Sequence, residues 1–179
     1  MKKMILFILA GFVLLAGVSA VTLNTARDNA QAYHLEQMRT LLPGSENFTR
    51  ETNTGDDPII QSVHKAENGY VIETVTRGYA DDLRMCIGVS NAGKVTGLMI
   101  DEAHETFGLG SKALNDHVFL AQFLNKTGPF AIGASGDGES VDGITGATVT
   151  SKAVARSVTA AVAYVTGADA TSAATSWGG

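Results

Sequence analysis

The apolar residues of the chain form one uninterrupted stretch near the N-terminus, and in the rest of the sequence they alternate with polar residues. Residues 4–23 contain no charged side chain and are rich in Leu, Ile, Val and Phe. Twenty residues of α-helix are about 30 Å long, which matches the hydrocarbon thickness of a bilayer. Lys2 and Lys3 precede the stretch, and basic residues favour the cytoplasmic side. The pattern predicts a single-pass anchor in the cell (inner) membrane, with residues 1–3 in the cytoplasm and everything after residue 23 on the outer (periplasmic or extracellular) face.

A cleaved signal peptide is the alternative interpretation of this stretch. Val18-Ser19-Ala20 resembles a small-residue cleavage site. The apolar run is longer than the usual signal-peptide core of about 7–15 residues, and it continues through Val21 and Leu23. We therefore expect an uncleaved anchor.

Residues 24–58 are predicted to form a helix and a linker. Apolar residues recur at helical spacing as far as Leu42, and Pro43-Gly44 ends the pattern. Residues 45–58 are polar and rich in turn-forming residues, which is typical of a loop. The compact domain is therefore expected to begin at residue 59.

The strands of this domain are predicted in its first half. Gly69-Tyr70 leads into an apolar run over residues 71–77. Two further runs, over residues 84–90 and 95–101, flank a Gly-containing turn at 91–94. This combination is typical of a β-hairpin.

Two helices are predicted in the second half. Apolar residues fall on one helical face over Lys112–Leu124 and again over Thr150–Val165, where Gly167 indicates the C-terminal end. We expect residues 59–166 to form an α+β domain in which a small sheet is packed by helices. Residues 167–179 are mostly small and are expected to be a disordered tail.

Composition narrows the classes of function. Of the 179 residues, 17% are charged, and 13 Lys and Arg against 18 Asp and Glu give a net charge of −5. Because Lys2 and Lys3 belong to the cytoplasmic end, the exported part is still more acidic, which disfavours binding to nucleic acid. Cys86 is the only cysteine. The sequence therefore excludes an intrachain disulfide and a multi-cysteine zinc or iron–sulfur site.

The common catalytic and metal-binding motifs do not occur in the sequence. His104-Glu105 begins like a zinc-protease motif, but Gly108 occupies the position of the second histidine. Neither a glycine-rich dinucleotide fingerprint nor a P-loop is present. Asp137-Gly138-Glu139 resembles the start of a calcium loop, but Val141 falls where a ligand oxygen is required. We therefore expect no metal site and no catalytic residue.

Two stretches suit the binding of a ligand. In residues 104–112, two glycines bracket a leucine and allow a close backbone approach to a planar ligand, although a plain strand-to-helix turn explains them equally well. The second stretch, Asp142-Gly-Ile-Thr-Gly-Ala-Thr148, leads into the last predicted helix. A match to Asp-x-x-Ser/Thr-Gly-Ala-Thr arises by chance in fewer than about one in a thousand chains of this length.

The second stretch favours binding of a phosphate. A helix N-terminus offers free backbone N–H groups and the positive end of the helix dipole. Lys152 adds a charge, and hydroxyls are available from Thr148, Thr150 and Ser151. The simpler alternative is that Thr150 or Ser151 is only the N-cap of the helix.

Taken together, these features resemble the flavin-binding domain of the G subunit of Rnf-type ion-translocating oxidoreductases, which also occurs in the C subunit of the sodium-pumping NADH:quinone reductase. The resemblance rests on the N-terminal anchor, the Leu42-Pro43-Gly44 break, the His-Glu-Thr-x-Gly-Leu-Gly stretch and the Asp-x-x-Thr-Gly-Ala-Thr motif. Because the chain is short and only a small-residue tail follows the last helix, it is more similar to the Rnf protein.

The resemblance implies FMN joined by a phosphoester bond to Thr148 and attached by a dedicated flavin transferase. The chemistry of the motif alone does not choose between Thr148 and Thr150. Phe107 stands where the family usually has proline, and it is available to pack on the flavin. The resemblance also implies that Asp142 belongs, with Thr145, Gly146 and Ala147, to the recognition sequence for the attachment. The other implied cofactor-binding residues are Thr145, Gly146 and Ala147 in the motif, Glu105, Thr106, Leu109 and Gly110 along the flavin ring, and Lys152 near the phosphate or ring edge.

The function implied by the resemblance is electron transfer. The chain would relay electrons as one subunit of a membrane complex that couples ferredoxin and NAD oxidoreduction to ion transport, beside other integral membrane subunits. The flavin carries out the chemistry, so no catalytic site of its own is expected. Two alternatives stay open: a stand-alone exported FMN carrier that feeds an extracellular reductase, and a non-redox membrane-anchored binding or assembly domain.

Overall fold

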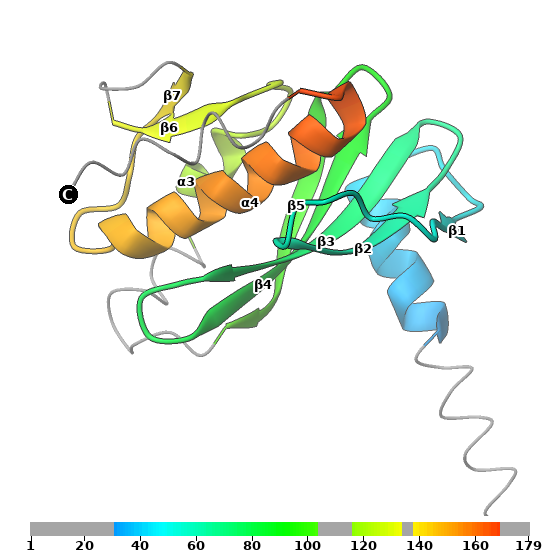
Figure 1. Ribbon diagram of the computed structural model, residues 1–179, viewed down its shortest axis with the longest axis horizontal. Coiled ribbons are helices and arrows are strands. Elements are labelled where there is room, and N and C mark those ends of the chain that lie inside the picture. Colours follow the sequence, from blue (N-terminus) through cyan, green and yellow to red (C-terminus); the bar gives the residue numbers. More distant parts are fainter. Residues whose placement is uncertain (1–30, 104–115, 134–137, 169–179) are drawn as a thin grey trace, which may run out of the picture. The chain divides into compact units, whose positions relative to one another are not determined.

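The computed structural model describes residues 31–103, 116–133 and 138–168. The chain divides into two compact units, Met1–Gln37 and Met38–Gly179. In the described part of the first unit, residues 31–37 are helical, and the second unit starts with helical residues 38–41 (Figure 1). The predicted helix that ends before Pro43 is thus confirmed over residues 31–41, and its first part lies outside the described residues.

Within the described ranges, we find no helix that combines the length and the apolar character needed to cross a bilayer. The predicted anchor over residues 4–23 lies outside these ranges, as does the predicted tail from residue 169 onward.

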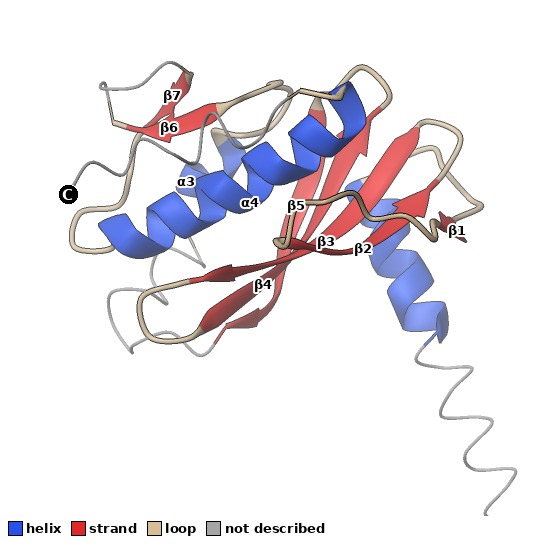
Figure 2. Cartoon of the chain, viewed as in Figure 1, coloured by secondary structure: helices blue, strands red, loops and turns tan. Residues whose placement is uncertain are grey.

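A five-stranded antiparallel sheet forms the centre of the second unit (Figure 2). Its strands follow one another in chain order, so each connection only has to reach the neighbouring strand. The strands are β1 (Thr49–Arg50), β2 (Ile60–Lys65), β3 (Gly69–Arg77), β4 (Asp82–Ser90) and β5 (Val95–Ala103).

The last three strands of the sheet confirm the sequence prediction, and the first two were not predicted. In the turn between β4 and β5, Gly93 has φ 75°, a conformation that glycine adopts without steric cost, and its N–H donates to the carbonyl of Ser90 at 2.8 Å. Strand β1 lies inside the segment predicted to be a loop. Strand β2 reads Ile-Gln-Ser-Val-His-Lys, which has too few apolar residues for a periodic signal.

Helix α4 (Thr148–Thr166) covers one face of the sheet and confirms the last predicted helix, with a start at Thr148 rather than Thr150. It ends at Gly167, which has φ 69° as a left-handed C-terminal residue. Alternate residues of a strand point to opposite faces, and one set of β4 side chains packs with α4. The core formed in this way includes Leu83, Met85, Ile87 and Val89 of β4 and Val154, Val158, Ala161 and Val162 of α4. The α+β class is therefore confirmed.

The opposite face of the sheet is covered by residues 38–42. Gly88 of β4 and Gly97 of β5 are paired across the two strands, and both lie against the backbone of Leu41. A Cβ atom on Gly88 would overlap the carbonyl oxygen of Leu41. Thr96 Oγ1 donates a hydrogen bond to that same oxygen at 2.6 Å. Gly88 thus allows a close contact that a side chain would prevent, and Gly97 lies against the same backbone at a slightly larger distance.

Helix α3 (His117–Ala121) and a parallel two-stranded pair, β6 (Phe130–Ile132) with β7 (Glu139–Val141), complete the unit. The backbone N–H of Phe130 donates to Thr159 Oγ1 of α4 at 3.1 Å, which ties β6 to that helix. The two strands were not predicted, because three residues are too few to show an alternating pattern.

The predicted helix over Lys112–Leu124 is wrong in its extent. Asp116 has an extended backbone with φ −84° and ψ 97°, so α3 starts only at His117. The Asp116 carboxylate accepts hydrogen bonds from the N–H groups of Val118 (3.0 Å) and Phe119 (3.1 Å), which makes it the N-cap. The apolar spacing predicts a helix across Asp116, but it does not detect that this residue acts as an N-cap.

The replacement Asp116→Ala is expected to lower the free energy of unfolding by about 1 kcal/mol, because two N–H groups of α3 lose their cap. Urea unfolding followed by circular dichroism measures this change. Asp56→Ala, at an exposed position in the loop before β2, is the matched control and should leave the stability unchanged. Equal stability of the two variants would show that the cap contributes nothing.

Candidate functional site

The second candidate motif forms the connection between β7 and α4. Residues 142–147 make up this connection, and the N–H of Ala147 donates to the carbonyl of Ile144 at 2.9 Å, which closes a tight turn. Gly146 lies within the turn and has φ 83°, a conformation disfavoured by residues with a side chain. Gly146 is thus required by the backbone conformation of the turn that leads into α4.

Three hydroxyl side chains follow the turn, and one of them is accessible. Thr148, the first residue of α4, is exposed, whereas Thr150 is 1% exposed and Ser151 is 0% exposed. The hydroxyl oxygen of Thr150 is buried and has no hydrogen-bond partner in the described part of the chain. The expectation that all three hydroxyls face a bound anion is therefore wrong, because only Thr148 presents its oxygen to solvent.

The hydroxyl of Ser151 holds the turn of the motif. It donates to the carbonyl of Ala147 at 2.9 Å and accepts a hydrogen bond from the N–H of Ile144 at 3.2 Å. Both partners are backbone groups of the segment before α4, so Ser151 fixes the shape of that segment. This role was not expected from the sequence.

The N-terminus of α4 has no side-chain cap. Ala147 occupies the N-cap position and forms no side-chain hydrogen bond there, so the alternative in which Thr150 or Ser151 is the N-cap is wrong. The N–H groups of the first helical turn have no partner within a helix, and the helix dipole adds a partial positive charge. Lys152 lies four residues after Thr148 on the same side of the helix. This helix start therefore suits an anion next to Thr148.

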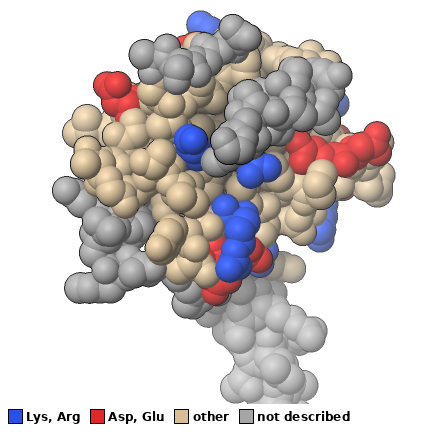
Figure 3. Space-filling model, turned by 60° about the vertical axis from the view of Figure 1, so that its left-hand side comes forward, with Lys and Arg blue, Asp and Glu red and all other residues tan. Residues whose placement is uncertain are grey.

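Charged side chains on the face shown in Figure 3 are scattered, with both signs present among uncharged residues. That face offers no extended basic patch among its described residues. Attraction of an anion to the start of α4 would therefore come from the local N–H groups and Lys152 rather than from a long-range field.

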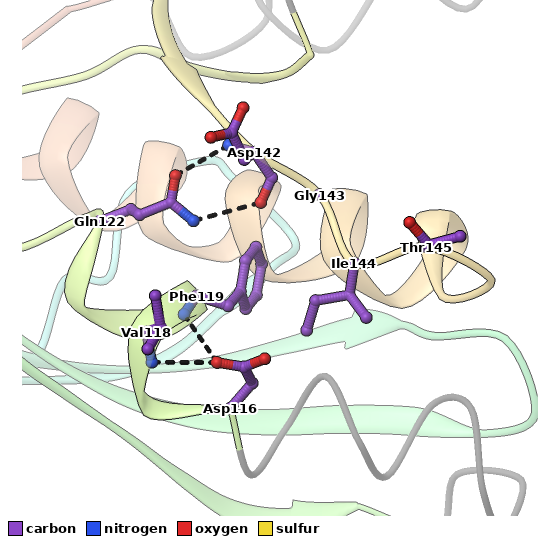
Figure 4. Close-up of a pocket in the computed structure, with 8 residues that line it drawn as sticks. All are labelled: Asp116, Val118, Phe119, Gln122, Asp142, Gly143, Ile144 and Thr145. Carbon is purple, nitrogen blue, oxygen red and sulfur yellow. Dashed lines mark hydrogen bonds between the residues drawn. The ribbon is translucent and has the colours of Figure 1, made fainter.

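A cavity of about 290 Å³ adjoins the motif (Figure 4). Its wall combines apolar and polar side chains, and its volume is close to the lower end of the range for small-molecule sites. Phe119 is 2% exposed and forms part of the wall, whereas the Asp116 carboxylate is already engaged in capping α3. The lining residues are Asp116, Val118, Phe119 and Gln122 from the α3 region and Asp142, Gly143, Ile144 and Thr145 from the motif.

The sequence of this chain is similar to a known protein family. The family model described as the FMN-binding domain matches residues 78–163, which include β4, β5, α3, the motif and most of α4. The chain resembles the G subunit of Rnf-type complexes. The matched residues include two of the five strands of the antiparallel sheet.

Two curated relatives share this similarity. The G subunit of the proton-translocating ferredoxin:NAD(+) oxidoreductase complex of Clostridium ljungdahlii is 29% identical over 156 residues, which is 86% of this chain and 83% of the relative. The G subunit of the Na(+)-translocating ferredoxin:NAD(+) oxidoreductase complex of Acetobacterium woodii is 38% identical over 96 residues, which is 50% of this chain and 45% of the relative.

Among solved structures, the chain is similar to the C subunit of the Na(+)-translocating NADH-quinone reductase from Parabacteroides distasonis. The TM-score is 0.48 and the sequence identity is 24%, over 60% of this chain and 61% of that chain. The chain thus spans about three fifths of this solved neighbour.

The structure brings together only part of the predicted site of the FMN-binding domain. Asp142 and Thr145 line the cavity, Gly146 and Ala147 form the turn, and Thr148 and Lys152 lie in the first turns of α4. The predicted ring contacts lie outside the described residues; they are Glu105, Thr106, Leu109 and Gly110, together with Phe107.

Phe119 and Gln122 line the cavity but were not among the predicted site residues. Phe119 belongs to the apolar pattern of its helix, so periodicity does not separate it from the core. The one available signal for Gln122 was its polar side chain within the largely apolar stretch 118–124.

Proposed function

We propose that this chain is a membrane-anchored flavoprotein that carries FMN in a phosphoester bond to Thr148 and relays electrons. It acts as one subunit of an Rnf-type ion-translocating ferredoxin:NAD oxidoreductase complex. The observation that carries the proposal is the Asp142–Thr148 motif, which leads into an uncapped helix start where Thr148 is exposed. The names of the relatives in C. ljungdahlii and A. woodii support the assignment to such a complex.

The residues at the start of α4 fit an FMN phosphate. A phosphoester on Thr148 Oγ1 places negatively charged oxygens beside N–H groups that have no side-chain cap. Lys152 adds a positive charge one helical turn later. The adjoining cavity, with Val118 and Ile144 in its wall, offers apolar surface to a planar ring. Phosphate and ring therefore find suitable chemistry on adjacent elements.

Attachment of the cofactor is a group transfer to Thr148. The hydroxyl oxygen of Thr148 forms a new bond to the phosphorus of the FMN unit, and the phosphoanhydride bond of a flavin dinucleotide donor breaks. The nucleoside monophosphate leaves, and the hydroxyl proton passes to a base of the flavin transferase. No oxidation state changes. The chain itself has to supply only an accessible hydroxyl in an ordered segment, which agrees with the exposure of Thr148.

Bound FMN supplies one- and two-electron transfer, and the residues of the chain hold it and set its surroundings. The turn closed by Ala147 and Ile144 presents the attachment point, and Ser151 keeps that turn in shape. Glu105, Thr106, Leu109 and Gly110 are proposed to lie along the flavin ring. The chain needs no catalytic acid or base for this role, because the cofactor alone exchanges electrons.

The membrane assignment is part of the proposal. Residues 4–23 are proposed to anchor the chain with its N-terminus in the cytoplasm, and the flavin domain, residues 59–166, then lies on the outer face. Other integral membrane subunits of the complex would be the electron-transfer partners. A covalent bond suits this location, since a dissociated cofactor would be lost from the cell surface.

Intact mass spectrometry of the full chain, purified from a host that contains the flavin transferase, tests this function. We expect the mass of the uncleaved chain plus one FMN less one water, and a band that stays fluorescent after denaturing electrophoresis. Purification in mild detergent from the native host should also recover several integral membrane proteins. A non-fluorescent chain of unmodified mass contradicts the flavoprotein proposal, and a flavinylated chain that purifies alone contradicts its role within a complex.

A further inference from the structure

The side chain of Gln122 forms two hydrogen bonds with the backbone of a single motif residue. Its Oε1 accepts from the N–H of Asp142 at 2.9 Å, and its Nε2 donates to the carbonyl of Asp142 at 3.2 Å (Figure 4). Both backbone groups of Asp142 are thereby satisfied by one planar amide. A pair of bonds of this kind fixes the orientation of the backbone as well as its position.

Gln122 is itself held by the core. Its own N–H donates to the carbonyl of Phe119 at 3.2 Å at the end of α3. Phe119 and Phe123, on either side of it in the sequence, are 2% and 0% exposed, and their ring centroids are 5.4 Å apart. The backbone of Gln122 is therefore held in place by the core. Through its side-chain amide, Gln122 fixes the motif relative to that core.

The hydrogen bonds from Gln122 to Asp142 hold the backbone in place for one residue beyond the end of strand β7. Val141 is the last residue of β7, and its carbonyl accepts from the N–H of Gly133 at 3.0 Å. Asp142 follows directly and is exposed. The next fixed point is Ile144, whose N–H is bound by the hydroxyl of Ser151. Gln122 thus holds the first residue of the motif, and Ser151 holds its middle.

We propose that Gln122 is a positioning residue for flavin attachment. Its amide orders Asp142, so that the motif from Asp142 to Thr148 is presented to the flavin transferase in one conformation. This inference rests on the proposed function. Without the amide, the free motif samples several conformations, and the transferase has to select the competent one. The apparent affinity then falls in proportion to the competent fraction, whereas the reaction at saturation is little affected.

The test measures flavin attachment to the full chain by purified transferase, with fluorescence in denaturing gels as the readout. Gln122→Met keeps the length of the side chain and removes both hydrogen bonds. We expect its KM as acceptor to rise about tenfold with a kcat close to that of the wild type, as two modest hydrogen bonds allow. Gln61→Met is the matched control, because Gln61 is exposed and its side chain bonds only the nearby carbonyl of Pro58, just before β2.

A second readout does not depend on flavin. In the unflavinylated chain, the amide proton of Asp142 should exchange with solvent faster in Gln122→Met than in the wild type, while the amides of α4 keep their protection. Gln122→Glu is the second variant, since it retains an acceptor for the N–H of Asp142 and loses the donor to its carbonyl. It should also raise KM.

The outcomes separate the inference from the proposed function. A wild-type chain that accepts no flavin overturns the proposed function. A wild-type chain that accepts flavin, with Gln122→Met and Gln122→Glu at wild-type KM, overturns the inference alone. Loss of the folded state in both variants, seen in their melting curves, also overturns it, because Gln122 would then serve the fold rather than the presentation of the motif.

Discussion

The replacement Thr148→Ala is expected to give a folded chain that carries no covalent flavin. Thr148 is the exposed hydroxyl at the start of α4, whereas Thr150 is 1% exposed and Ser151 is engaged with the backbone of Ile144 and Ala147. Neither of these two later hydroxyls of α4 is therefore placed to replace it. The intact mass should equal that of the unmodified chain, and fluorescence in a denaturing gel should be absent.

Two further variants make this result specific. Thr148→Ser keeps the hydroxyl and should retain detectable attachment. Thr150→Val keeps the shape of a side chain whose hydroxyl has no hydrogen-bond partner in the described structure, and it should retain both the flavin and the stability. A fluorescent Thr148→Ala chain would contradict attachment at Thr148, and a non-fluorescent Thr150→Val chain that is folded would favour Thr150 instead.

The second large effect is expected at Gly88, where a single methyl group should strongly destabilise the domain. A Cβ atom there overlaps the carbonyl oxygen of Leu41 and also lies 2.6 Å from Thr96 Oγ1. The carbonyl accepts a hydrogen bond from Thr96, so it cannot move away without loss of that bond. Gly88→Ala should lower the free energy of unfolding by about 3 kcal/mol, at the upper end of the effects of overpacking. Urea unfolding measures the change.

Gly97→Ala is the matched control for this prediction. Gly97 is paired with Gly88 across the strands, and a Cβ atom there would lie 3.0 Å from two backbone atoms of Leu41, so a shift of a few tenths of an ångström relieves the contact. We expect a loss of about 1 kcal/mol. If Gly97→Ala destabilises the chain as much as Gly88→Ala, the segment over residues 38–42 does not pack on the sheet as described.

The sequence was informative wherever a local pattern was long enough. Strands β3 to β5 and helix α4 each contain nine or more residues, and their apolar positions or turn residues were readable without tertiary information. Strands β6 and β7 have three residues each and are paired through contacts that sequence periodicity does not encode. Helix α3 was predicted to be too long because the capping role of Asp116 competes with a helix-forming pattern.

The site shows the same division. The motif that ends at Thr148 and the expectation of a free helix N-terminus came from residues adjacent in the sequence. The bonds of Gln122 to Asp142 join residues 20 positions apart, and they were not predictable because a side chain that pairs with a distant backbone leaves no periodic signal. The burial of the Thr150 hydroxyl depends on how α4 packs on the sheet, which the sequence alone does not reveal.

Helix α4 is buried along most of its length, from Thr150 to Ala163. A flavin bonded to Thr148, as proposed, would be attached to the end of a helix that cannot bend or slide without disruption of the core. The flavin ring would then be joined to this fixed point through the Thr148 side chain, the phosphoester and the ribityl chain of FMN. The attachment point would therefore move only with the whole domain, so its distance from an electron donor or acceptor would be set by how the domain docks.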